Sequence, residues 1–191
     1  MRVIAGKAKG KLLFAPSGMN TRPITAMMKE ALFSIWQGEI IDADFLDLFA
    51  GSGSMGIEAL SRGARKAVFV ELDKNAVDVI KENIKNCKFN DSAVVYKDDV
   101  FNRISLLEAT GQTFDIIYLD PPFTRDEIFL PVLEAVTSAD ILNQNGEIAI
   151  RTVKEKEMPE EIGDYYKYKL KIYGQSAIHF YCKYAHFLPV S

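Results

Sequence analysis

Hydrophobic and polar positions follow two different periods along most of this chain. Residues 43–49, 66–71 and 114–119 are short, nearly continuous apolar runs, which are typical of strands buried on both faces of a parallel sheet. The segments between such runs place apolar residues three and four positions apart, which is the spacing of one helix face. We therefore expect strands and helices to alternate. In chain order the expected elements are strand 43–49, helix 54–62, strand 66–71, helix 73–86, strand 93–96, helix 100–109, strand 114–119, helix 125–139 and strand 146–152.

The N-terminal segment has a different pattern. Residues 2–14 have apolar ends around a Gly-Lys-Ala-Lys-Gly centre, which predicts a β-hairpin with a basic tip. Residues 26–36 then place Met28, Leu32, Ile35 and Trp36 on one helical face, with Thr25 positioned as an N-cap. We expect Leu32, Phe33 and Trp36 to be core residues.

The C-terminal segment is expected to form two strands with no helix between them. The β-like runs 166–173 and 177–184 are separated by only three residues, so they should form an antiparallel hairpin. Alternation closed by a hairpin predicts an α/β fold with a mostly parallel, doubly wound sheet of seven strands, one of them antiparallel. We expect a single domain, with residues 1–37 as a hairpin and helix appendage and residues 38–191 as a Rossmann-like body. In such sheets ligands bind at the carboxyl ends of the strands.

Charge and composition narrow the possible partners. The net charge is −3, yet residues 1–36 carry six Lys or Arg side chains against the single acid Glu30. A basic end can bind a polyanion locally, although basic ends are also often merely solvated. Cys87 and Cys182 form no metal or redox spacing, so we expect no metal site. The chain shows no signal peptide and no apolar run of membrane-spanning length, so a cytoplasmic protein is expected.

A glycine-rich stretch, FLDLFAGSGSMGIE at 45–58, connects the first expected strand to the first helix of the body. Gly51, Gly53 and Gly56 suit a tight turn that lets the backbone approach a ligand, and Asp47 lies within the strand. Glu71 follows at the position where a dinucleotide fingerprint has its ribose-binding acid. The glycines alone fit a nicotinamide enzyme and an S-adenosylmethionine enzyme equally well.

Further acids follow the next strands. Glu71 suits two ribose hydroxyls of an adenosine cofactor, the alternative being a solvated loop acid. Asp99 suits an adenine amino group, with the Val100 N–H for a ring nitrogen, and a helix cap is an equally good interpretation. The cofactor site predicted from these positions consists of Asp47, Ala50, Gly51, Ser52, Gly53, Glu71, Leu72, Asp99 and Val100.

The sequence Asp120-Pro121-Pro122-Phe123 follows the fourth strand and indicates the chemistry. An amine conjugated to a nucleobase is a poor nucleophile, but the Asp120 carboxylate and the Pro121 carbonyl can accept its two hydrogens and aim its lone pair at a methyl sulfonium. Two prolines fix the backbone and offer no N–H, and Phe123 offers a face for a flipped base. Hydride transfer needs no such clamp, and Asp47 suits the amino group of a methionine moiety, so we infer S-adenosylmethionine as the cofactor.

These motifs resemble those of amino-group methyltransferases of nucleic acids. Together with RVIAGKAKG at 2–10, TRPITAMMKEALFSI at 21–35, LSRGA at 60–64 and YGQSAIHFY at 173–181, they resemble the RsmD family, whose members modify the 2-amino group of one guanine in 16S ribosomal RNA. The resemblance implies a methyltransferase fold, cofactor binding by Asp47, Gly51, Gly53, Glu71 and Asp99, and catalysis by Asp120, Pro121, Pro122 and Phe123.

The resemblance also implies RNA contacts from the N-terminal segment, with ribosomal RNA or an assembling small subunit as the partner of a monomeric protein. The RNA-binding residues expected are Arg2, Lys7, Lys9, Lys11 and Arg22, the last of which suits either phosphate or the cofactor carboxylate. Ala26 and Met27 depart from the family, which has an acidic and then a basic residue there. His179 and His186 are expected to be structural. A DNA or protein-amide methyltransferase, a nicotinamide oxidoreductase and a non-catalytic RNA-binding module remain alternatives.

Overall fold

The computed structural model describes residues 1–17 and 24–184, which include eight strands. The chain divides into two compact units, Met1–Val100 and Phe101–Ser191, and each is described by itself. Seven of the eight strands match the seven that the sequence predicts. The eighth, β6, has only two residues.

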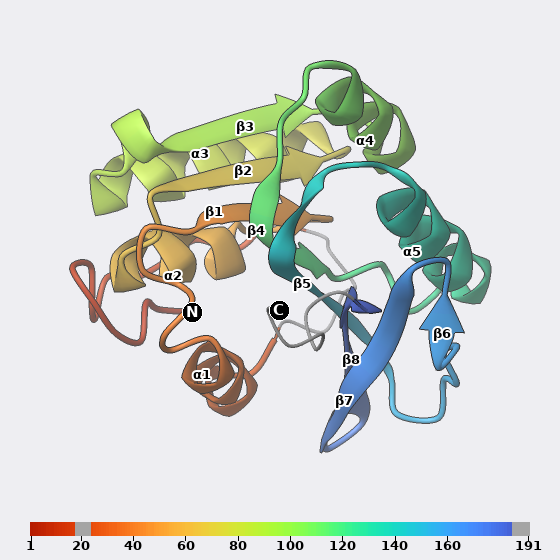
Figure 1. Cartoon of the computed structure of the whole chain (residues 1–191). Helices are drawn as coiled ribbons and strands as arrows, with labels where there is room; N and C mark the ends of the chain where they lie inside the picture. The colour runs from red at the N-terminus through yellow and green to blue at the C-terminus, as the bar shows by residue number, and fades with distance from the viewer. Residues whose placement is uncertain (18–23, 185–191) are drawn as a thin grey trace. The chain divides into compact units, whose positions relative to one another are not determined.

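The first unit contains a parallel three-stranded segment in the order β3-β2-β1 (Figure 1). Helices α2 and α3 pack against these strands. The register pairs Leu48 with Val70 and Glu71 with Lys97, so the three strands end at one edge. The elements are α1 (Ala26–Ile35), β1 (Asp44–Leu48), α2 (Ser54–Arg62), β2 (Lys66–Glu71), α3 (Lys74–Cys87), the 3₁₀ turn η1 (Asn90–Ser92) and β3 (Ala93–Lys97).

The second unit has strands in the order β4-β5-β8-β7-β6. Strands β4 and β5 are parallel, whereas β8 runs antiparallel to β5 and forms the expected hairpin with β7. Leu119 pairs with Ile150, so the ends of β4 and β5 lie side by side. The elements are α4 (Val100–Ala109), β4 (Phe114–Leu119), η2 (Asp126–Ile128), α5 (Phe129–Ser138), β5 (Leu142–Val153), β6 (Glu161–Ile162), β7 (Tyr165–Tyr173) and β8 (Ser176–Lys183).

Helix α1 confirms its sequence prediction. The Thr25 hydroxyl accepts the Met28 N–H at 3.2 Å and so caps the helix. Phe33 and Trp36 are fully buried, and their ring centroids lie 5.3 Å apart, edge to face. Both rings contact Phe45 of β1, which attaches α1 to the strand that carries Asp47. Ile35 is only partly buried, so the apolar face is narrower than expected.

Three predicted elements differ from the structure. Strand β5 begins at Leu142 rather than at residue 146. The helix expected from residue 125 starts at Phe129, because the 3₁₀ turn Asp126–Ile128 precedes it. The N-terminal hairpin has antiparallel arms, in which the Val3 N–H donates to the Lys11 carbonyl at 2.9 Å, but only Arg2 and Leu12 form a β-bridge. Its two arms are therefore an extended loop rather than two regular strands.

Candidate active site

The glycine-rich turn after β1 is held by two buried acids. Glu71 at the end of β2 accepts the Gly51 N–H at 2.8 Å with one carboxylate oxygen and the Asp73 N–H at 2.9 Å with the other. Asp47 within β1 accepts the Gly56 N–H at 3.0 Å near the start of α2. Because both acids bond backbone amides, the turn is fixed in the protein itself.

The glycines of this turn are required by geometry. Gly51 and Gly53 have φ of +57° and +75°, where a side chain is strained. An ideal Cβ on Gly56 would lie 2.3 Å from the Phe69 ring of β2, so only glycine lets α2 approach the sheet this closely. Gly51 and Gly53 thus have the turn role that the sequence predicted, whereas the packing role of Gly56 was not predicted.

The residues at this edge fit an adenosine cofactor. An ideal Cβ on Gly51 meets no atom of the described residues within 4 Å, so there is space beside the turn. Each Glu71 oxygen accepts one amide, and a carboxylate oxygen has room for a second donor such as a ribose hydroxyl. Leu72 is 62% exposed and offers an apolar surface next to that acid.

The third strand end lies at the same edge. The Asp98 N–H donates to the Glu71 carbonyl at 3.1 Å, and the Asp98 carboxylate accepts the Asp99 N–H at 2.9 Å. Helix α4 begins at Val100, which makes its N–H one of the first-turn donors. The structure therefore gathers all nine predicted cofactor residues at the carboxyl ends of β1, β2 and β3.

The target-amine residues predicted from the sequence follow β4 in the second unit. Asp120 is partly exposed, and Arg151 from β5 donates from one nitrogen to both of its carboxylate oxygens, at 3.0 and 3.3 Å. Burial raises the pKa of Asp120, while the charge and hydrogen bond of Arg151 and the Tyr118 hydroxyl act in the opposite direction. The Arg125 N–H donates to the Pro122 carbonyl at 3.1 Å, which closes a turn around Phe123.

Arg151 is the site residue that the sequence analysis missed. Its guanidinium carbon lies 4.9 Å from the centroid of the Phe123 ring, and its side chain is 3% exposed. The rule that ligands bind beyond the carboxyl ends of strands does not point to Arg151, because Arg151 lies within β5, two residues before its end at Val153.

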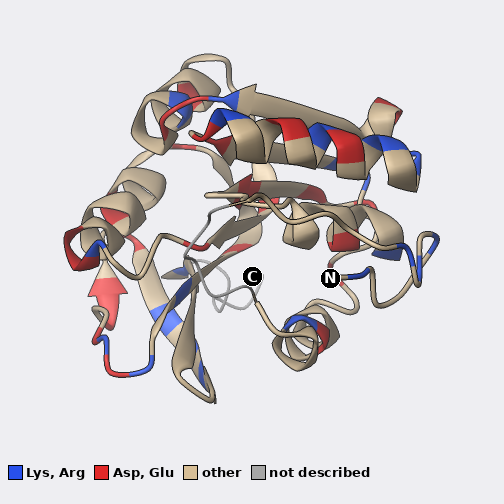
Figure 2. Ribbon diagram, turned by 180° about the vertical axis from the view of Figure 1, so that it is seen from behind, with Lys and Arg blue, Asp and Glu red and all other residues tan. Residues whose placement is uncertain are grey.

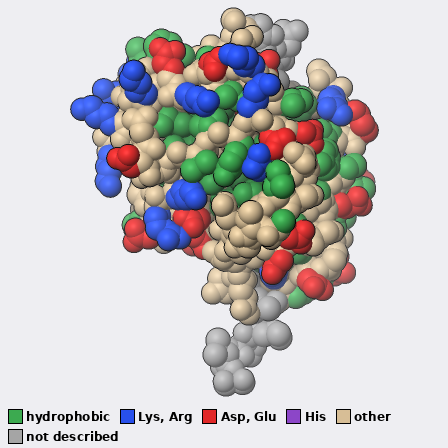
Figure 3. All heavy atoms as spheres, turned by 90° about the horizontal axis from the view of Figure 1, so that it is seen from above, with side chains coloured by type: hydrophobic (Ala, Val, Ile, Leu, Met, Phe, Trp, Pro, Cys, Tyr) green, Lys and Arg blue, Asp and Glu red, His purple; other side chains and the backbone are tan. Residues whose placement is uncertain are grey.

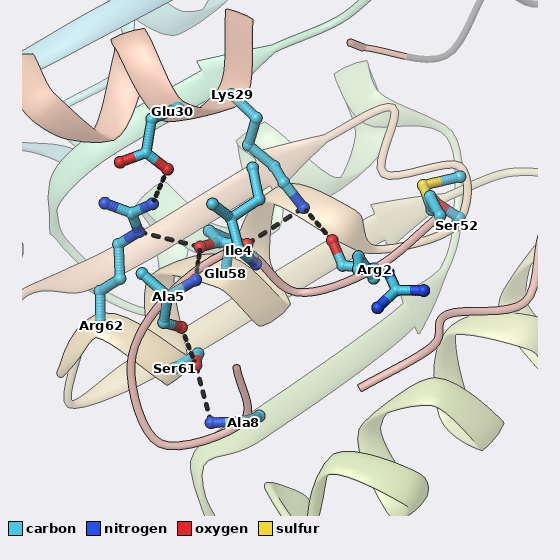
Figure 4. Close-up of polar contacts among 12 residues, drawn as sticks. Arg2, Ile4, Ala5, Ala8, Lys29, Glu30, Ser52, Glu58, Ser61 and Arg62 are labelled. Carbon is cyan, nitrogen blue, oxygen red and sulfur yellow. Dashed lines mark hydrogen bonds and ion pairs between the residues drawn. The ribbon is translucent and has the colours of Figure 1, made fainter. Parts of the chain in front are cut away.

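The basic N-terminal loop, residues 1–13, is anchored on α2 (Figure 4). Glu58 is fully buried and accepts the N–H groups of Ile4 and Ala5 at 2.9 and 3.0 Å. The same carboxylate pairs with Lys29 at 3.1 Å and with Arg62 at 2.9 Å. Burial lowers the pKa of Lys29, and Glu58 opposes that change. Sequence patterning did not indicate this network, since a helix-borne Glu usually faces solvent.

The lysines of this loop point outward while its backbone is fixed. Lys7, Lys9 and Lys11 are exposed, and the ribbon in Figure 2 is blue at basic positions along this loop. Gly6 has φ of +79°, and an ideal Cβ there would lie 1.8 Å from the Ser61 carbonyl oxygen, so the loop touches α2 directly. Arg2 is also exposed, whereas Arg22 lies outside the described residues.

A cavity of about 300 Å³ lies among the N-terminal loop, the start of α1 and the start of α2. Arg2, Lys29 and Ser54 supply its polar wall, and Ala26 also lines it. Met27 is 74% exposed. The face drawn in Figure 3 carries both acidic and basic side chains.

His179, Cys87 and Cys182 take no part in either cluster. His179 is 2% exposed and its Nε2 lies 3.1 Å from the Thr152 hydroxyl, which fits the structural role predicted for it. His186 lies outside the described residues. Cys87 and Cys182 are buried free thiols. Within residues 1–17 and 24–184, no group of three or more His, Cys, Asp or Glu could hold a metal, and no helix is long and apolar enough to cross a membrane.

Comparison with known proteins identifies the family. The family model described as Conserved hypothetical protein 95 matches residues 1–182. "Ribosomal RNA small subunit methyltransferase D" of Escherichia coli K12 is 32% identical over 187 residues, which cover 95% of this chain and 89% of that protein. The chain belongs to the RsmD family.

Other relatives agree with this membership. The Bacillus subtilis protein named "Putative rRNA methyltransferase YlbH" is 35% identical over 183 residues, covering 96% of this chain and 99% of its own. The solved structure titled "Putative methyltransferase yhhF from Escherichia coli" has a TM-score of 0.83 at 29% identity and covers 97% of this chain and 98% of its own. The expected methyltransferase fold, a Rossmann-like α/β architecture, is thus confirmed.

Proposed function

We propose that this protein uses S-adenosylmethionine to methylate the 2-amino group of a guanine in 16S ribosomal RNA. The observation that carries the proposal is the Asp120-Pro121-Pro122-Phe123 loop, whose carboxylate is partly exposed and paired with Arg151. Family relatives named for methylation of small-subunit ribosomal RNA support this substrate. Such a substrate also favours action in the cytoplasm, where ribosomes are assembled.

The first unit would hold the cofactor. Glu71 would accept hydrogen bonds from the two ribose hydroxyls, and Asp99 with the Val100 N–H would bind the adenine edge. Asp47, Ala50, Ser52 and the glycine turn would surround the methionine part. When bound, S-adenosylmethionine supplies an electrophilic methyl group on a sulfonium sulfur.

The second unit would hold the target amine. The Asp120 carboxylate and the Pro121 carbonyl would accept the two hydrogens of the guanine 2-amino group. Drawing on those hydrogens moves the nitrogen from planar towards tetrahedral geometry and localises its lone pair. Transfer would form the nitrogen–carbon bond and break the sulfur–methyl bond, leaving the neutral thioether S-adenosylhomocysteine. The methylated nitrogen would then be positively charged and acidic, so its extra proton would pass to Asp120 or to water. Phe123 would stack on the flipped base, a contact worth about 1–3 kcal/mol.

The N-terminal loop would hold the RNA backbone. Lys7, Lys9 and Lys11 are exposed on a loop that Glu58 and Ser61 fix on α2, so they can contact phosphates without a large ordering cost. Arg2, at the rim of the same loop, would add a further phosphate contact. Phosphate contacts of this kind fix register, while the target pocket reads the base.

Transfer of a labelled methyl group to purified RNA, DNA and protein fractions tests the proposal. We expect label in small-subunit ribosomal RNA, and Asp120→Ala should lower the rate by several orders of magnitude while leaving S-adenosylhomocysteine affinity nearly unchanged. Asp126→Ala is the matched control, because Asp126 is an exposed acid in the next turn of the chain. Label in DNA or protein would favour another amino-group methyltransferase. RNA binding without label would indicate a binding module.

A further inference from the structure

The register of β4 and β5 places Arg151 next to Asp120. Leu119 of β4 pairs with Ile150 of β5, and each is followed directly by one member of the ion pair. The Arg151 side chain is 3% exposed, and its Nη1 lies 3.0 Å from one Asp120 oxygen and 3.3 Å from the other. Two parallel neighbouring strands therefore fix the basic and acidic side chains relative to each other.

The same guanidinium contacts two further groups of the second unit. Its carbon lies 4.9 Å from the centroid of the Phe123 ring, within the range of a cation–π contact. The Ser176 hydroxyl at the start of β8 accepts long hydrogen bonds from Nε at 3.4 Å and from Nη2 at 3.3 Å. Ser176 is 4% exposed and pairs with Val153 of β5, so it is itself fixed by the sheet.

We propose that Arg151, supported by Ser176, is a positioning residue for methyl transfer, which holds the Asp120 carboxylate and the Phe123 ring in the arrangement that receives the target base. This inference rests on the function proposed above. The inference adds that Arg151 joins the two groups that would contact the base. These are the Asp120 carboxylate, which would accept the amine hydrogens, and the Phe123 ring, which would stack on the base.

The three contacts explain why arginine suits this position. A planar guanidinium presents separate N–H groups to a carboxylate and to a hydroxyl while its face lies on an aromatic ring. The ammonium of a lysine is a compact charge and cannot make all three contacts together. An arginine that served only to satisfy a buried acid would not need to touch the ring or be oriented by Ser176.

Arg151 also influences the ionisation of Asp120. The titratable groups that contact Asp120 among the described residues are Arg151 from β5 and Tyr118 from β4. The ionised carboxylate is an acceptor only, so it can accept an amine hydrogen and the arginine at the same time. Because burial raises the pKa of Asp120 and Arg151 opposes this, removing the arginine should move its titration to higher pH.

Steady-state kinetics of Arg151→Met and Arg151→Lys on small-subunit ribosomal RNA test the proposal. We expect Arg151→Met to lower kcat by about 100-fold, the loss typical of a displaced reacting group, with unchanged S-adenosylhomocysteine affinity. The acidic limb of its kcat/KM profile should move to higher pH. Arg151→Lys should restore the position of that limb but not kcat. Arg125→Met is the matched control, because Arg125 is an exposed arginine of the same loop.

The outcomes separate this inference from the proposed function. If the wild type does not methylate ribosomal RNA, the proposed function fails. If the wild type is active while Arg151→Met melts at a lower temperature but keeps its kcat and pH profile, the arginine is only structural and the inference is overturned. If Arg151→Met does not fold, Ser176→Ala provides a second test. We expect Ser176→Ala to lower kcat by about tenfold while the KM for RNA stays unchanged. An unchanged kcat in Ser176→Ala would overturn the role of Ser176.

Discussion

Glu71 offers the sharpest test of the proposed cofactor site. Its two carboxylate oxygens each accept one backbone N–H, from Gly51 at 2.8 Å and Asp73 at 2.9 Å, and the proposal assigns each oxygen one ribose hydroxyl as well. A hydrogen bond to a charged group contributes about 1.5–3 kcal/mol. Loss of two such bonds in Glu71→Ala should therefore weaken binding by at least about 3 kcal/mol, which is about 100-fold in Kd.

Titration calorimetry with S-adenosylhomocysteine measures this effect. The Kd of Glu71→Gln should lie between those of wild type and Glu71→Ala, because the single carbonyl oxygen of glutamine can accept only some of the hydrogen bonds that the carboxylate accepts. Asp78→Ala is the control, since Asp78 is an exposed acid on α3 that pairs with Lys74. A folded Glu71→Ala protein whose Kd changes less than about threefold would refute the ribose assignment, since that is under about 0.7 kcal/mol.

Two further predictions concern stability and RNA binding. Burial, and to a smaller extent the nearby charge of Lys167, lowers the pKa of His179 to about 4 in the folded protein. The pKa of a histidine in the unfolded chain is about 6.5, so between these two pH values the proton binds to the unfolded chain and not to the folded protein. The free energy of unfolding should therefore drop by up to about 3 kcal/mol as the pH falls from about 6.5 to about 4. In His179→Gln, the free energy of unfolding measured with urea should depend less on pH over this range. The same pH dependence in wild type and His179→Gln would contradict this role of His179. Replacing the three loop lysines with alanine should reduce the salt dependence of RNA binding by up to about 2–3 units of slope, measured by fluorescence anisotropy. An unchanged slope would exclude the loop as the phosphate contact. The residues changed are Lys7, Lys9 and Lys11, and the control set on α3 and its C-cap is Lys81, Lys85 and Lys88.

The contacts that anchor the N-terminal loop on α2 could not be predicted from the local pattern of apolar and polar residues. Helix α2 was predicted with its observed bounds, yet Glu58 on it is fully buried among Lys29, Arg62 and two amides of the loop. Removing one partner of such a buried set typically costs about 3–5 kcal/mol, because the remaining charge is left unpaired. Partners that lie more than fifty residues apart in the chain, as Glu58 and Ile4 do, leave no trace in periodicity.

The candidate site was predictable to the extent that strand ends determine it. Apolar runs located β1, β2 and β4, so Asp47, Glu71 and Asp120 could be placed from the sequence. Arg151 was missed because it lies within β5 rather than beyond its end, so attention to the residues after each strand did not include it. The predicted start of α5 was wrong by four residues, since a 3₁₀ turn of three residues is too short for its spacing of apolar residues to be distinguished from that of an α-helix.

Mass-spectrometric mapping of ribosomal RNA from cells with and without this protein shows whether the protein methylates its proposed target. We expect one guanine of 16S ribosomal RNA to carry an N2-methyl group only when the protein is present. The protein with Asp120→Ala should not restore the modification, whereas the protein with Asp126→Ala should. Identical modification maps in the two strains, or a methyl group lost from a position other than a guanine 2-amino group, would refute the proposed function.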